Sequence, residues 1–193
     1  MNEDSPVHDR LLCERRKTVR IFIPPSGRHF RVVAEMDDEI HHITMSILLD
    51  QVTLKIMEIN CEMPGVPDEV CRQAATIFDP LVGEHLRPGL IKKLKASPQN
   101  GCLHLADLFR DACYNAAFAQ WIRGREKINA MFPDASEEQF FEISSWFHPE
   151  LHNSCIRYSG NSPFMERVRN VKLPARAEKI RTAVMSRLHG KRR

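Results

Sequence analysis

The fold class is decided by residues 41–56, which read HHITMSILLDQVTLKI. From residue 43 every second position is apolar, and successive side chains of a strand point to opposite faces. The apolar positions that share one face are Ile43, Met45, Ile47 and Leu49. After Asp50 and Gln51 the alternation resumes, at Val52, Leu54 and Ile56. Two alternating runs joined by a short polar step predict an antiparallel hairpin.

The flanking sequence extends this hairpin into a sheet and then changes to helical periodicity. Residues 18–23 and 30–36 are short β-branched or apolar runs, separated by the turn sequence PPSG at 24–27. Apolar residues at helical spacing then predict helices at residues 67–82, 88–96, from 102 onward, 134–146 and 174–188. Residues 147–173 are loop-like. We therefore expect an α+β fold, with a small antiparallel sheet in the N-terminal third packed against several helices.

Charge is distributed unevenly along the chain, which has an acidic body (1–165) and a basic tail (166–193). Lys and Arg number 28 and Asp and Glu 25 in 193 residues, which gives +3. Residues 166–193 contain ten basic and two acidic residues, so this segment carries +8 and the rest −5. We expect a flexible leader (1–16), a single α+β domain (17–165) and a basic C-terminal helical tail (166–193). The acidic body argues against nucleic-acid binding outside the tail.

Two absences favour a cytoplasmic protein. No apolar run approaches the roughly 18 residues that cross a bilayer, and the acidic start MNEDSP lacks the apolar segment of a secretory signal. Six cysteines without a C-x-x-C pair fit reduced thiols better than a disulfide framework or a zinc ribbon. The motifs of dinucleotide-binding, P-loop, α/β-hydrolase and zincin enzymes are missing as well.

Two of the cysteines, Cys71 and Cys102, stand in or just before the first turn of a predicted helix. There the helix dipole and the free N–H groups favour a thiolate, which is the form that binds metal. Two such sulfurs can converge on one ion, with an imidazole completing the shell. The alternative is that both thiols are small packing residues of the core.

The histidines His41 and His42 open the alternating strand behind Asp38. Strand parity puts His41 on the apolar face and His42 on the polar face, so only one of them faces a given site. A histidine at the start of a strand is more commonly a surface or hydrogen-bonded residue than a metal ligand. Either histidine is a candidate ligand, and Asp38 is a candidate catalytic base.

The short motif GCLHL at 101–105 contains Cys102 and His104. Within a formed helix these two residues would point about 200° apart and could not bind the same ion. Either Cys102 precedes the helix, or His104 caps it or supports a ligand from behind. Asp107 is a second candidate base, and the loop residue Cys155 is a candidate third sulfur.

The order of these residues resembles a known family. Asp38 with His41-His42, then Cys71, then GCLHL, is similar to a bacterial domain-of-unknown-function family with a Gly-Cys-x-His-Leu signature. A later cysteine loop of that family is matched by Ser154-Cys155, and the resemblance covers about residues 31–167.

A more distant similarity is to NifU/IscU-like iron–sulfur scaffolds. That resemblance implies a small antiparallel sheet with packed helices, which holds zinc or a nascent cluster on three cysteines plus an aspartate or histidine. Cys71 matches the middle scaffold cysteine, although the preceding glycine is missing, and Cys102 matches the last one. The scaffold histidine precedes that last cysteine, whereas His104 follows Cys102. The first scaffold cysteine falls near His41-His42, where imidazole replaces sulfur.

The leading hypothesis is a domain that binds a mononuclear zinc or iron ion through Cys71, Cys102 and one of His41 or His42. His104 or Cys155 would be the fourth ligand. With an open coordination position, the ion would activate water in a small metalloenzyme acting on a small-molecule substrate. One alternative is a non-catalytic iron–sulfur or metal scaffold that docks on a partner protein, and another is a metal-free Cys/His thiol enzyme. The substrate and the oligomeric state are left open.

Overall fold

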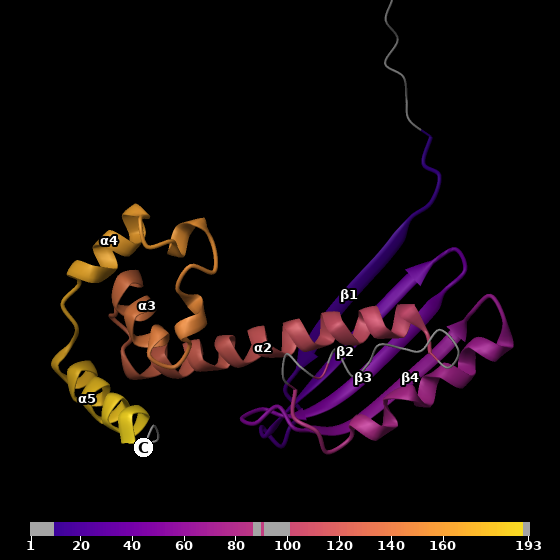
Figure 1. The fold of residues 1–193 in the computed structure, drawn as a ribbon, viewed down its shortest axis with the longest axis horizontal. Coiled ribbons are helices and arrows are strands. Elements are labelled where there is room, and N and C mark those ends of the chain that lie inside the picture. Colours follow the sequence, from indigo (N-terminus) through magenta and orange to yellow (C-terminus); the bar gives the residue numbers. More distant parts are fainter. Residues whose placement is uncertain (1–9, 87–89, 91–100, 191–193) are drawn as a thin grey trace, which may run out of the picture. The chain divides into compact units, whose positions relative to one another are not determined.

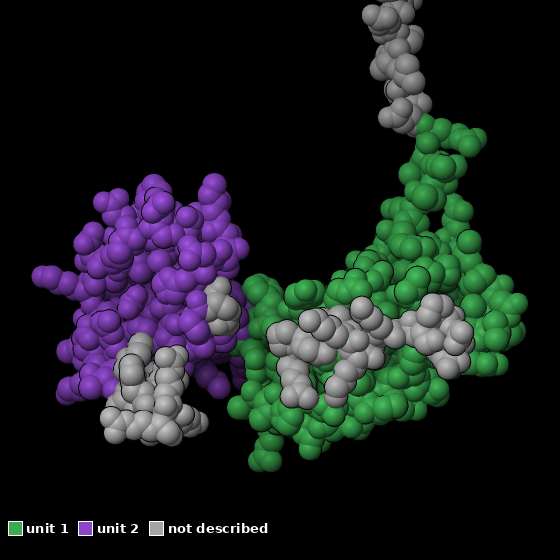
Figure 2. Space-filling model, viewed as in Figure 1, with its two compact units in different colours: residues 1–120 green, residues 121–193 purple. Residues whose placement is uncertain are grey.

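The computed structural model describes residues 10–86, 90 and 101–190, and the chain divides into two compact units (Figure 1, Figure 2). Unit 1 comprises residues 1–120 and unit 2 residues 121–193, so that helix α2 (Leu103–Met131) contributes to both. Compact packing does not by itself define a folding domain, and the boundaries expected after residues 16 and 165 therefore stay predictions. No helix in the described ranges is both long and apolar enough to span a membrane.

Unit 1 is built on a four-stranded antiparallel sheet in the order β1-β2-β3-β4 (Figure 1). The strands are β1 (Arg15–Phe22), β2 (His29–Asp38), β3 (His42–Asp50) and β4 (Ile56–Gly65). The two central strands bury one face, as the alternation predicts, and its residues are Phe30, Val32, Ala34, Met36, Ile43, Met45, Ile47 and Leu49. The α+β class and the antiparallel sheet in the N-terminal third are confirmed.

Two helices pack on the apolar face of this sheet. The first, η1 (Glu69–Leu81), is a 3-10 helix whose N-cap Asp68 accepts a hydrogen bond from the Val70 N–H. The ring of Phe78 in η1 stacks on Phe109 in α2, with ring centroids 5.3 Å apart, and both rings belong to the core that includes the sheet residues. The helix predicted from residue 67 is therefore present, with a tighter winding and a start at residue 69.

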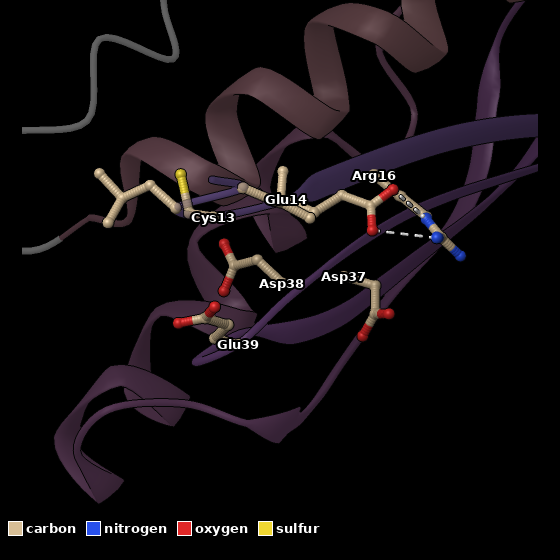
Figure 3. A pocket seen from close by; sticks show the side chains of 8 residues that line it. Cys13, Glu14, Arg16, Asp37, Asp38 and Glu39 are labelled. Carbon is tan, nitrogen blue, oxygen red and sulfur yellow. Dashed lines mark hydrogen bonds and ion pairs between the residues drawn. The ribbon is translucent and has the colours of Figure 1, made fainter. Parts of the chain in front are cut away.

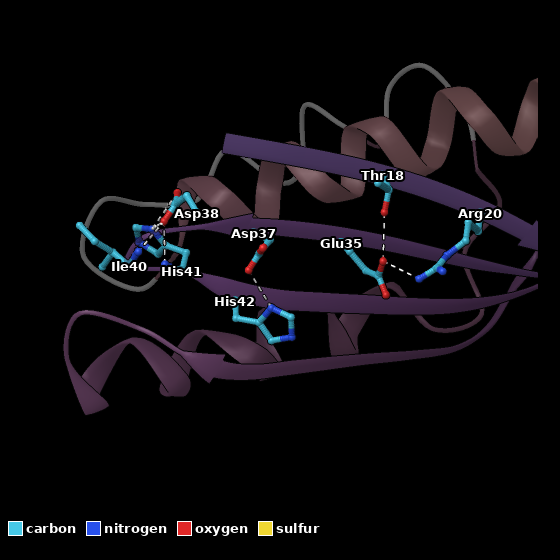
Figure 4. Close-up of polar contacts among 8 residues, drawn as sticks. All are labelled: Thr18, Arg20, Glu35, Asp37, Asp38, Ile40, His41 and His42. Carbon is cyan, nitrogen blue, oxygen red and sulfur yellow. Dashed lines mark hydrogen bonds and ion pairs between the residues drawn. The ribbon is translucent and has the colours of Figure 1, made fainter. Parts of the chain in front are cut away.

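The opposite face of the sheet carries polar side chains that pair across strands (Figure 4). Glu35 of β2 accepts hydrogen bonds from Thr18 Oγ1 at 3.0 Å and from Arg20 Nη2 at 2.5 Å, both on β1. Nearer the end of β2, Asp37 lies 3.0 Å from Nδ1 of His42 on β3. Exposed pairs of this kind contribute little to stability, so the apolar face holds the sheet together.

The return strand of the hairpin begins later than the sequence predicts. Val52 is exposed in a turn, and β4 starts only at Ile56. The Asp50 carboxylate causes this, because it accepts hydrogen bonds from the backbone N–H groups of Val52 and Thr53 and from the Thr53 hydroxyl. This turn ends at Leu54, whose φ of 54° lies in the left-handed region.

Unit 2 is helical, and two of its helices agree with the sequence. After the end of α2 its elements are α3 (Glu137–Ser145), η2 (Pro149–Leu151), η3 (Ile156–Tyr158), α4 (Pro163–Asn170) and α5 (Ala175–Gly190). Helix α3 lies in the predicted range 134–146 and begins at a capping box, in which Ser136 and Gln139 each accept a hydrogen bond from the backbone N–H of the other. Helix α5 coincides with the predicted basic helix.

The prediction that residues 147–173 are loop-like is wrong, since α4 lies within them. Ser162 caps this helix by accepting a hydrogen bond from the Met165 N–H at 3.1 Å, and Pro163 occupies the first turn. The predicted helix at 88–96 lies outside the described residues, apart from Leu90.

Candidate functional site

The first part of the candidate site is the turn between β2 and β3. The Asp38 carboxylate accepts hydrogen bonds from the backbone N–H groups of Ile40 at 2.8 Å and His41 at 2.7 Å. The same oxygen, Oδ1, lies 3.1 Å from Nδ1 of the His41 ring (Figure 4). In the tautomer with the proton on Nδ1, His41 donates to Asp38 and keeps the lone pair of Nε2 for a proton or a metal ion.

Arg15 completes the surroundings of the Asp38 carboxylate. It is the first residue of β1 and stands opposite Asp38 in the strand register, and its Nη2 lies 2.6 Å from Oδ2. The Asp38 side chain is only 9% exposed. Hydrogen bonds from the N–H groups of Ile40 and His41, and then those from Arg15 and the His41 ring, hold the pKa of Asp38 well below its usual value. Asp38 is therefore a fixed anion that orients His41.

The second part of the site is the start of α2, which brings His104 against His41. The two ring centroids are 4.2 Å apart, and the ring planes are inclined by 56°. Burial lowers the pKa of His104, and the nearby His41 and Arg15 add to this effect, while Asp38 and Asp107 oppose it. His104 is therefore mainly a neutral imidazole at pH 7, with a nitrogen lone pair that can accept a proton or bind a metal ion.

Only one residue of the His41-His42 pair belongs to this cluster. The side chain of His41 is 13% exposed, whereas that of His42 is 60% exposed and faces Asp37 on the polar side of the sheet (Figure 4). This agrees with the parity argument from the sequence, since His42 lies on the polar face of β3, whereas His41, the residue before the strand, packs against His104.

Four cysteines of unit 1, Cys61, Cys71, Cys102 and Cys113, belong to its core or pack against it, whereas Cys13 is exposed. Cys102 precedes α2, and its carbonyl oxygen accepts a hydrogen bond from the Ala106 N–H at 3.0 Å. Of the two arrangements that the sequence left open, Cys102 therefore lies before the helix. Cys71 lies in η1, and both thiols are half-buried. Cys61, another half-buried thiol, lies on β4. Burial raises the pKa of the Cys61 thiol to about 12, with Asp79 and Cys102 adding to the shift.

Asp107 and Cys155 are the remaining predicted site residues. Asp107 is on α2, one turn after His104, and its carboxylate pairs with Arg110 at 2.8 Å. Cys155 is exposed and belongs to unit 2, where it precedes η3. In the described part of the chain, no three His, Cys, Asp or Glu side chains are grouped so that they could hold a metal ion. The structure thus assembles Asp38, His41 and His104, but not the ligand set of His41, Cys71 and Cys102.

An open hollow of about 390 Å³ lies beside Asp38 (Figure 3). Its walls are the segment before β1 and the end of β2, through Leu11, Leu12, Cys13, Glu14, Arg16, Asp37, Asp38 and Glu39. Glu14 and Arg16 form an ion pair at its edge, with Arg16 Nε 2.9 Å from the carboxylate. Asp38 is the residue that this hollow shares with the histidine cluster. Sequence reasoning missed the hollow and Arg15, because both depend on how β1 registers against β2.

Comparison with known proteins finds a family that is similar to part of unit 1. Residues 24–118 match the family model described as "Protein of unknown function (DUF2889)". This part of the chain is similar to that family. The matched DUF2889 segment contains Asp38, His41, Cys71, Cys102 and His104, and it leaves unit 2 outside. No curated protein and no solved structure matches the chain.

Proposed function

We propose that unit 1 binds one zinc or iron ion through His41 and His104, as the centre of a small metalloenzyme that acts on a small-molecule substrate. The observation that carries this proposal is the contact between the two imidazole rings, one of which is hydrogen-bonded to the buried carboxylate of Asp38. Metal-bound histidines commonly donate their second ring N–H to a carboxylate in this way. Zinc and iron both accept imidazole ligands.

The third ligand in this proposal is Cys102, from the segment that leads into α2. A thiolate is a good ligand for either metal, and the N-terminus of a helix stabilises its charge. Cys71, in the same core, is the candidate for the fourth position. His42 drops out of the set because it faces Asp37 on the polar face of β3, and Cys155 of unit 2 is not part of this proposal. Because no group of three is in place among the described residues, binding must draw Cys102 toward the histidines.

The reaction in this proposal uses the hollow beside Asp38 as the substrate site. With His41, His104 and Cys102 as ligands and Cys71 left in the core, the fourth position would be open to a water molecule, and the ion would supply Lewis-acid activation of that water. Asp38 acts as the orienting group of His41 and not as the base, since its oxygens are engaged by Ile40, His41 and Arg15. The carboxylates that line the hollow favour a neutral or cationic substrate over an anionic one.

A second candidate function is metal-free acid–base chemistry, which is favoured by the lack of an assembled third ligand in the described residues. Here His41, oriented by Asp38, removes a proton from the substrate, or His104 removes the proton of the Cys102 thiol. A non-catalytic iron–sulfur scaffold, the third possibility from the sequence, requires the cysteines to carry the metal in place of the histidines.

The test is the metal content of the tag-free protein and of three histidine variants after anaerobic incubation with Zn²⁺ or Fe²⁺. We expect about one ion per chain in the wild type and in His42→Gln, and loss of the ion in His41→Gln and His104→Gln. Asp38→Asn keeps the shape of the carboxylate without its charge and is expected to weaken metal affinity by about 10- to 100-fold.

Each other outcome of this test discriminates between the candidates. An ion that persists in both histidine variants but is lost in Cys71→Ala/Cys102→Ala would assign the site to the cysteines and overturn the histidine proposal. Absence of metal from the wild type would overturn metal binding altogether. In that case alkylation of Cys102 that slows in His104→Gln would support the thiol enzyme.

A further inference from the structure

Unit 2, which lies outside the matched family segment, contains an apolar cavity of its own. The cavity has a volume of about 190 Å³ and lies between the last turns of α2 and the end of α3. Its surface is almost wholly apolar, and its main walls are Trp121, Gly124, Ile128, Met131 and Phe147. Apolar cavities with a few convergent polar groups are the usual form of small-molecule sites.

One residue in the wall of this cavity has a buried hydroxyl without a hydrogen-bond partner among the described residues. Ser144 is 2% exposed, lines the cavity, and has no hydrogen-bond partner for its Oγ within the described ranges. By contrast, the hydroxyl of the next residue, Ser145, donates a hydrogen bond to the Glu142 carbonyl at 2.8 Å. Buried polar groups in folded proteins nearly always have a partner. The partner of Ser144 is therefore to be sought in a molecule that occupies the cavity.

The rim of the cavity is basic. Arg125 and Lys127 on α2 line it, and none of the described residues in its wall is a carboxylate. The guanidinium of Arg125 lies over the rings of Trp121 and Phe140, at 5.7 and 5.5 Å from their centroids, and this holds the charge beside the apolar wall. An occupant with a negative charge is therefore favoured over a neutral or cationic one.

The size of the cavity limits the occupant to a small ring. An apolar cavity of about 150 Å³ admits a benzene molecule, and this one is somewhat larger. Gly124 keeps the space open, since a Cβ at this position would meet only His148 Nε2, at 3.9 Å. We propose that the cavity of unit 2 binds a single-ring aromatic carboxylate that carries a hydroxyl group. The ring packs among the apolar walls, the hydroxyl bonds to Ser144 Oγ, and the carboxylate faces Arg125 and Lys127.

The probes are 4-hydroxybenzoate, benzoate and 4-hydroxybenzyl alcohol, each titrated into the full-length chain by isothermal calorimetry. We expect saturable 1:1 binding of 4-hydroxybenzoate, with benzoate about five- to tenfold weaker because it lacks the hydrogen bond to Ser144. The alcohol, which lacks the charge, is expected to bind more weakly by a similar factor. Equal affinity for all three probes, or no saturable binding of any, would overturn the proposal.

Two pairs of variants locate the binding. Ser144→Ala is expected to weaken 4-hydroxybenzoate about five- to tenfold and to leave benzoate unchanged, whereas the matched control Ser145→Ala leaves both unchanged. Gly124→Leu is expected to fill the cavity and abolish binding, while Gly124→Ala retains it. Because leucine and alanine are better helix formers than glycine, both variants remain folded. Binding that survives Gly124→Leu would place the ligand elsewhere and refute the assignment.

Discussion

Replacement of Gly65 by alanine tests how the end of the sheet holds the candidate site. Gly65 is the last residue of β4 and pairs with His42 at the start of β3. A Cβ on Gly65 would lie 2.8 Å from the His42 backbone nitrogen and 2.9 Å from its Cβ. Neither atom can rotate away, because both are fixed by the strand backbone. The two strands must therefore separate beside His41.

The cost of this separation follows from the size of the overlap. Unstrained contacts between heavy atoms lie at about 3.5–4.0 Å, so the strands must move apart by roughly 0.5 Å or more. Overpacking of this kind costs about 1–3 kcal/mol, and the lower entropy of the unfolded alanine chain offsets about 0.4–1 kcal/mol. We expect a net loss of about 1–2 kcal/mol in the free energy of unfolding. With a slope of about 2 kcal/mol per molar urea, the midpoint falls by about 0.5–1 M.

The assay is urea unfolding followed by circular dichroism, with Gly124→Ala as the control. The control adds the same methyl group in the interior of α2, where the nearest atom is 3.9 Å away, and is expected to raise stability by about 0.5–1 kcal/mol. A midpoint of Gly65→Ala at or above that of the wild type would refute the tight pairing of β3 and β4 at His42.

Three further predictions concern the core, the thiols and the acid response. Phe109 is fully buried, so Phe109→Ala is expected to cost about 3–5 kcal/mol in urea unfolding, and a loss below 1 kcal/mol would contradict the shared core. Burial raises the pKa of the Cys113 thiol to about 12. At pH 8, mass spectrometry should therefore find the exposed Cys155 alkylated well before Cys113. Equal alkylation rates of the two thiols would contradict the burial of Cys113. The hydrogen bond from Arg167 lowers the pKa of Glu138 below its usual 4.5. This pair therefore stabilises unit 2 above pH 4.5 and is lost on acidification, so Glu138→Gln should flatten the fall of the melting temperature below pH 4.5, and an unchanged slope would contradict the pair.

The sequence predicts those elements whose signal is local and repeated. The alternation from Ile43 to Leu49 marks a strand with one buried face, because a shift of one residue would expose every apolar side chain. The capping box of Ser136 and Gln139 marks the start of α3 for a similar reason, since both hydrogen bonds lie within four residues. The parity of His41 and His42 also follows from the strand alone.

Elements that depend on a single side chain or on distant contacts escape this reasoning. The apolar alternation over residues 52–56 is too short to distinguish a strand from the turn that the Asp50 carboxylate stabilises by accepting backbone hydrogen bonds. The start of α4 has a local signal, Ser162-Pro163, which is easily overlooked in a polar stretch. The pairing of Arg15 with Asp38 needs the register of β1 against β2, which no local pattern contains.

The candidate site shows the same division between local and distant information. The Asp38–His41 contact spans three residues and could be expected from the sequence. The contact between His41 and His104 joins residues more than 60 positions apart and depends on how α2 lies on the sheet. For this reason the sequence brings Asp38 and His41 together, whereas only the structure shows that the rings of His41 and His104 are in contact.

The most direct test of the central claim is long-range ¹H–¹⁵N NMR of the histidine rings during Zn²⁺ addition. Before addition, His41 is expected in the tautomer with the proton on Nδ1, which donates to Asp38. On addition, the Nε2 signal of His41 and one ring nitrogen of His104 should shift together and saturate at about one ion per chain, while His42 stays unchanged. Unshifted rings of His41 and His104, or a His42 that shifts equally, would contradict the account.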